Sequence, residues 1–86
     1  MIYAVKCINL QDCQYQARRY MEEYKLQIKE VRRHRPTPVI ILNSGDEIHF
    51  LTHFTWDSWC KGLTYKFLGE DTLYHGKFPI KTQKTD

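Results

Sequence analysis

Apolar residues recur at steps of three and four along the first third of the chain. They are Leu10, Cys13, Ala17, Tyr20, Met21, Tyr24, Ile28 and Val31. This period is typical of one face of an amphipathic helix. Pro36 sets a limit to the helix, because the residue before a proline disfavours helical torsions. The pattern therefore predicts one long helix from Leu10 to about Arg33, with its apolar face against a sheet.

The start of this helix carries capping chemistry. The side chain of Asn9 can accept a hydrogen bond from the free amides of the first turn. Asp12, three residues later, can accept from the backbone amide of Asn9 in return, as in a capping box. Ile8 is then expected to pack on Cys13 as a hydrophobic staple.

The other elements are shorter and read as strands and turns. The expected strands are Ile2–Ile8, Val39–Leu42, Glu47–His53, Thr64–Leu68 and Thr72–His75. The second of these is a continuous apolar run, which is typical of a strand buried on both faces. Asn43–Asp46 and Gly69–Asp71 have the composition of hairpin turns, and residues 55–61 predict a short helical turn that ends near Gly62.

These elements predict an α+β fold. We expect a two-layer sandwich in which one long helix packs on a mostly antiparallel sheet of four or five strands. The 86 residues suffice for one domain, placed at residues 1–78, with a loose basic tail at 79–86. A chain of this length buries only about 60% of the surface that its unfolded state exposes, so a homodimer stays open as an alternative.

Cellular location follows from what the sequence lacks. No stretch reaches the roughly 20 apolar residues of a membrane span, and the first residues do not resemble a signal peptide. The three cysteines, Cys7, Cys13 and Cys60, are an odd number that fits reduced, buried thiols. The sequence therefore predicts a soluble cytoplasmic protein that does not associate with membranes.

Positive charge is concentrated in one segment, residues 17–35. Seven cations face three acids there, a balance of +4, whereas the whole chain carries +3. The cations are Arg18, Arg19, Lys25, Lys29, Arg32, Arg33 and Arg35. They could be the solvated face and the end of a helix, or a contact surface for an anionic partner, since arginine matches phosphate and carboxylate geometry.

The sequence supports metal binding and catalysis less well than it supports a contact surface for an anionic partner. The cysteines and His34, His49, His53 and His75 lack the spacing of a structural zinc site. His49 and His53 lie four apart on an expected strand, which places them about 13 Å apart. A metal-independent nuclease that uses these histidines is an alternative, but we expect no catalytic residue, no metal and no cofactor. A phosphate-binding loop is absent.

Residues 41–51, followed by 61–68, resemble the interior of the ATPase core of viral large terminases and related helicase-like enzymes. The resemblance covers about 28 of the 86 residues. It departs from the family in the reversed turn order of Ser44-Gly45, in Lys61 where the family has arginine, and in Gly69-Glu70-Asp71 where paired acids would follow. The resemblance implies a strand-hairpin-strand scaffold and a small accessory protein of a phage. It transfers no ATPase activity.

Nucleic-acid binding is the function that the residues favour. The seven cations supply phosphate contacts, and Tyr15 on the polar side of the helix supplies a face for base stacking. RNA is favoured over duplex DNA because no helix-turn-helix spacing is visible. The competing hypothesis is an inhibitor or adaptor of a host protein, in which Trp56 and Trp59 would be hydrophobic anchors if exposed.

Overall fold

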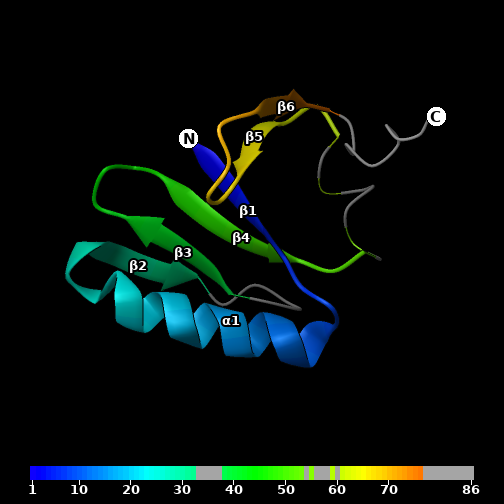
Figure 1. The fold of residues 1–86 in the computed structure, drawn as a ribbon. Helices are drawn as coiled ribbons and strands as arrows, with labels where there is room; N and C mark the ends of the chain where they lie inside the picture. Colours follow the sequence, from blue (N-terminus) through cyan, green and yellow to red (C-terminus); the bar gives the residue numbers. More distant parts are fainter. Residues whose placement is uncertain (33–37, 54, 56–58, 60, 77–86) are drawn as a thin grey trace.

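A six-stranded mixed sheet and one α-helix make up the described part of the chain (Figure 1). The computed structural model describes residues 1–32, 38–53, 55, 59 and 61–76. In chain order the elements are β1 (Ile2–Lys6), α1 (Leu10–Glu23), the 3₁₀ turn η1 (Lys25–Gln27), β2 (Ile28–Arg32), β3 (Val39–Leu42), β4 (Glu47–Leu51), β5 (Thr64–Phe67) and β6 (Leu73–His75). The strand order in the sheet is β2-β3-β4-β1-β5-β6.

The expected sheet of four or five mostly antiparallel strands is wrong. β1 lies between β4 and β5 and is parallel to both, whereas β2–β3, β3–β4 and β5–β6 are antiparallel. The reason is burial: Ala4 and Val5 point to opposite faces of β1 and are both buried. A strand that is apolar on both faces is most stable in the centre of a sheet.

The expected helix from Leu10 to about Arg33 is also wrong. α1 ends at Glu23, the chain turns through η1, and the residues from Ile28 onward form β2, an edge strand paired with β3. The pairing register shifts between Ile28 and Glu30, which marks a β-bulge. The bulge lets Ile28 and Val31, three residues apart, pair with Leu42 and Ile40 on the same face. The spacing of the apolar residues in this bulged strand is therefore the same as the spacing expected of a helix.

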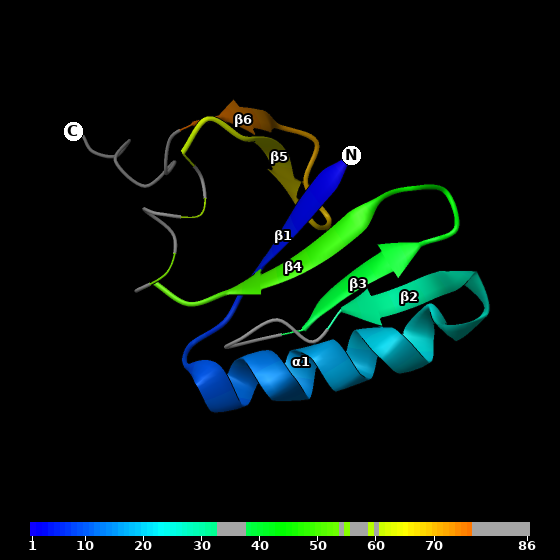
Figure 2. The same cartoon turned by 180° about the vertical axis from the view of Figure 1, so that it is seen from behind.

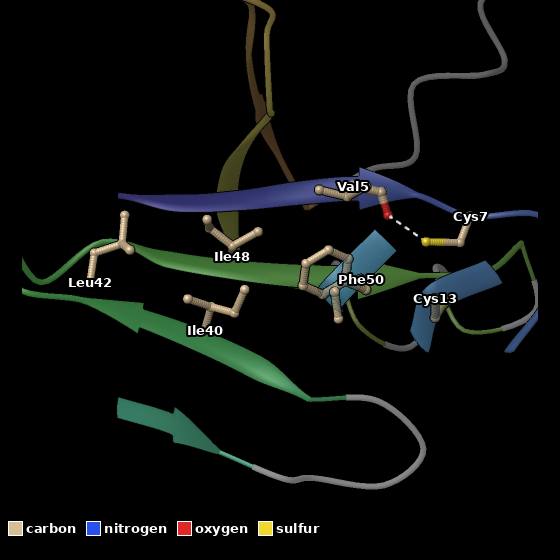
Figure 3. Close-up of a cluster of buried hydrophobic side chains, with 8 residues drawn as sticks. Val5, Cys7, Cys13, Ile40, Leu42, Ile48 and Phe50 are labelled. Carbon is tan, nitrogen blue, oxygen red and sulfur yellow. Dashed lines mark hydrogen bonds between the residues drawn. The ribbon is translucent and has the colours of Figure 1, made fainter. Parts of the chain in front are cut away.

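The helix side of the sheet contains the larger of two apolar clusters. Cys13 and Ala17 of α1 are fully buried against Ile40, Ile48 and Phe50, as Figure 3 shows for the labelled members. In Figures 1 and 2, α1 lies beside β2 and β3, and the β5–β6 hairpin lies on the other side of β1. The helix therefore leaves the β5–β6 end of this face uncovered.

The opposite side of the sheet has an aromatic cluster. Tyr65 and Phe67 of β5 are buried with Ala4 and Leu51, and Trp59 packs on them from the segment that follows β4. The ring of Trp59 meets that of Tyr65 edge-on at 4.9 Å. This second cluster makes the central strands buried on both faces, and Val39–Leu42 is buried at every position, as expected.

The cap of α1 is confirmed in part. Asn9 Oδ1 accepts from the Asp12 amide at 2.8 Å. The carboxylate of Asp12 reaches back to the amide of Ile8 at 2.9 Å. The expected staple is wrong, because the side chain of Ile8 is 83% exposed and does not pack on Cys13. Leu10, expected on the buried stripe, is exposed too.

Both expected hairpins are confirmed. β3 and β4 are joined by Asn43–Asp46, where Gly45 takes the positive φ of 96° that favours glycine. The Met1 amine lies 2.9 Å from Asp46 Oδ1, and this hydrogen bond lowers the pKa of the Asp46 carboxyl. β5 and β6 flank the second turn.

Within the expected helical turn at 55–61, the amide of Trp59 donates to Thr55 O at 3.1 Å. Trp56 and the expected tail at 79–86 lie outside the described residues.

Candidate nucleic-acid interface

The basic residues of segment 17–35 do not share one helix. Arg18 and Arg19 lie on α1, Lys25 lies on η1, and Lys29 and Arg32 lie on β2. All five are exposed. Arg33, His34 and Arg35 lie outside the described residues. The cations were expected on the face and the end of one helix. They lie instead on a corner, which we call the basic corner: the outward face of α1, the η1 turn and the edge strand β2.

The acids of the same elements neutralise part of this charge. Lys25 lies 3.8 Å from Glu22, and Arg32 lies 3.2 Å from Glu30. Exposed pairs of this kind contribute about 0–1 kcal/mol to stability, so they hold the side chains only weakly. Arg18, Arg19 and Lys29 make no ion pair with any residue that the structure describes. The charges of these three cations are therefore available to an anionic ligand.

An aromatic side chain accompanies two of these cations. Tyr15 is 58% exposed and lies three and four residues before Arg18 and Arg19, which places the three side chains on the outward face of α1. Arg19 is held by the side chain of Gln16 at 3.1 Å and by the Tyr20 ring at 5.7 Å. The outward face therefore combines an exposed ring with an arginine whose contacts in the described chain are to neutral groups.

Trp59 is not an isolated, exposed side chain. Its ring is partly buried in the cluster behind the sheet, and its indole Nε1 donates to His49 Nδ1 at 3.2 Å. His49 Nδ1 must therefore be unprotonated, so Nε2 carries the proton and donates to Glu47 Oε1 at 2.9 Å. Both ring nitrogens are occupied, which favours a structural role for His49 over acid–base catalysis.

The Trp59–His49–Glu47 network was not found from the sequence. His49 and Glu47 are neighbours on one face of β4, a signal that the alternation of the strand contains. Trp59 is ten residues further on, and no local pattern shows that it returns to this face. Elsewhere in the described structure, His75 Nδ1 lies 2.7 Å from Thr64 Oγ1, and His53 is exposed.

The cysteines of the described chain are buried thiols. Burial raises the pKa of Cys7 and of Cys13, and the hydrogen bond between their side chains raises that of Cys7 further. A thiol that stays protonated is a poor nucleophile and a poor metal ligand. Among the residues that the structure describes, no group of three or more His, Cys, Asp or Glu side chains could hold a metal ion.

Comparison with known protein families, with curated proteins and with solved structures finds no match to this chain. The comparisons therefore do not bear on the resemblance to viral terminases. In the described part of the chain, α1 is too short and too polar to cross a membrane.

Proposed function

We propose that the protein binds single-stranded nucleic acid, RNA in the first instance, through the basic corner. The observation that carries the proposal is the outward face of α1. There Tyr15 is exposed beside Arg18 and Arg19, neither of which is neutralised by a carboxylate of the described chain. Single-strand binding needs cations that track the phosphates and an aromatic ring on which a base stacks.

The position of α1 supports a single strand over a duplex. Its apolar side is fixed against the sheet through Cys13 and Ala17, so only its outward face is available to a ligand. An exposed tyrosine ring has no stacking partner in a closed duplex, whose bases are stacked on one another, whereas a single strand can turn a base onto it. Lys29 on β2 extends the positive charge around the corner.

The proposal is tested by fluorescence anisotropy with labelled RNA of about 12 nucleotides, within the site sizes of single-strand binders. The protein should bind at low salt, and log affinity should fall linearly with log salt. In Arg18→Gln, the slope should decrease by about 0.7, the value for one phosphate contact to a single strand. Lys61→Gln is the matched control, because Lys61 is exposed, carries the same charge and lies in the chain between Trp59 and β5, away from the basic corner.

The triple variant at Arg32, Arg33 and Arg35 extends the test along the sequence. Removal of three phosphate contacts should lower the slope by about two units, and circular dichroism checks that the variant is folded. Absence of RNA binding by folded protein at low salt would overturn the proposal. That outcome would leave an acidic surface of a protein partner as the alternative.

A further inference from the structure

A groove lies next to the basic corner, between α1 and the carboxyl ends of β1 and β5. Its volume is about 140 Å³. The residues that line it include Val5, Tyr20 and Leu68, which belong to the cluster on the helix side of the sheet, and Glu70. Pockets for drug-sized ligands run to about 300–1,000 Å³, so this groove has room for one ring system only.

The groove is joined to the basic corner by one contact. Tyr20 lines the groove, and the guanidinium of Arg19 lies 5.7 Å from the centre of the Tyr20 ring. A nucleic-acid strand bound by Arg19 on the outward face of α1 is therefore separated from the groove by one side chain, that of Tyr20. Tyr20 itself is fixed by the rings of Tyr24 at 6.2 Å and Phe50 at 5.9 Å, so this wall is rigid.

Glu70 is the acidic residue that lines the groove. The chain also borders the groove at Lys6, but the Lys6 ammonium lies 5.8 Å from the centre of the Phe67 ring, which belongs to the aromatic cluster on the opposite side of the sheet. Glu70, in the turn after β5, is exposed, and its carboxylate makes no hydrogen bond or ion pair with any described residue. An ionised carboxylate only accepts hydrogen bonds, so a ligand that uses Glu70 must present N–H or O–H donors.

We infer that this groove holds a nucleobase with an exocyclic amino group, as in cytosine or adenine. The flat ring would lie against Tyr20 and the apolar floor of Val5 and Leu68, with its amino group donating to Glu70. Uracil lacks that amino group and offers only its ring N3–H, which is flanked by two carbonyl oxygens that repel the carboxylate, so uracil should bind less tightly. The inference rests on the proposed function, because a free base has no affinity for the cations of the basic corner.

The experiment compares labelled oligocytidine and oligouridine of about 12 nucleotides at neutral pH and fixed salt. The native chain should bind oligocytidine about fivefold or more tightly, the lower range of discrimination by one base-edge contact. In Glu70→Gln this ratio should fall toward one, because a carboxamide offers both a donor and an acceptor and no longer selects for the amino group.

The matched control is Asp71→Asn. Asp71 is the exposed neighbour of Glu70 and does not line the groove. Both substitutions remove one negative charge, and this charge effect by itself should strengthen binding to both oligomers to the same extent. Only Glu70→Gln should also change the ratio of the two affinities. Equal binding of the two oligomers by the native chain, or a ratio that survives in Glu70→Gln, overturns the inference and leaves the basic corner in place. Failure to bind either oligomer overturns the proposed function itself.

Discussion

The cost of one isoleucine deletion should differ sharply between two sites. Ile40 on β3 is 0% exposed, whereas Ile8 before α1 is 83% exposed. Replacing either by alanine removes the same atoms. At Ile40 the loss includes a cavity between the sheet and α1, and large-to-small changes of this kind cost about 2–5 kcal/mol. At Ile8 no cavity forms, and exposed substitutions stay within about 0.5 kcal/mol.

These magnitudes are large for a chain of this size. At about 0.05–0.15 kcal/mol per residue, 86 residues give a free energy of unfolding of about 4–13 kcal/mol. A loss of about 3 kcal/mol in Ile40→Ala should lower the Tm by about 12–24 °C, since each kcal/mol shifts small domains by about 4–8 °C. Ile8→Ala should move the Tm by less than about 4 °C.

Urea and thermal unfolding, followed by circular dichroism, measure both variants against the native chain. The comparison also tests the expected staple, because a staple would bury Ile8 against Cys13. Equal destabilisation in the two variants would show that Ile8 is buried and that the exposed position in the structure is wrong. A cost below about 1 kcal/mol at Ile40 would contradict the packing of β3 beneath α1.

Two further predictions concern groups that the sequence did not connect. Trp59→Phe keeps an aromatic ring but removes the N–H that donates to His49, so the free energy of unfolding should fall by about 1 kcal/mol. The ring ¹⁵N signals of His49 should no longer show a single tautomer. Unchanged stability and spectra would contradict this contact. In a Cys60→Ser background, Cys7 and Cys13 should react with a disulfide reagent only as the protein unfolds, because burial raises the pKa of both thiols. Rapid reaction of the native protein would show that the two thiols are accessible.

The candidate site was predictable only as a set of residue types. Charge counting identified the cations of segment 17–35, and helical spacing placed Tyr15 with Arg18 on a polar face, as the structure has them. The groove beside Tyr20 had no sequence signal. It is formed by α1, β1 and the turn after β5, which the fold brings together from separate parts of the chain.

Local chemistry was sufficient for elements whose signals lie within a few residues. The Asn9 cap, the apolar run Val39–Leu42 and the turn at Gly45 act on their immediate neighbours, so the sequence by itself determined the start of α1 and the β3–β4 hairpin. The end of α1 was different. Ile28 and Val31 have a spacing that fits a helix as well as a bulged strand, and nothing local separates the two.

Tertiary structure decided that choice and the strand order. β2 pairs with β3, which places Val31 opposite Ile40 and satisfies the backbone groups of an apolar strand that would otherwise be buried without partners. β1 enters between β4 and β5 because residues about 45 and 60 positions away supply the partners that bury both of its faces. Such contacts depend on which surfaces become buried together when the whole chain folds, and a pattern read along the sequence does not contain that information.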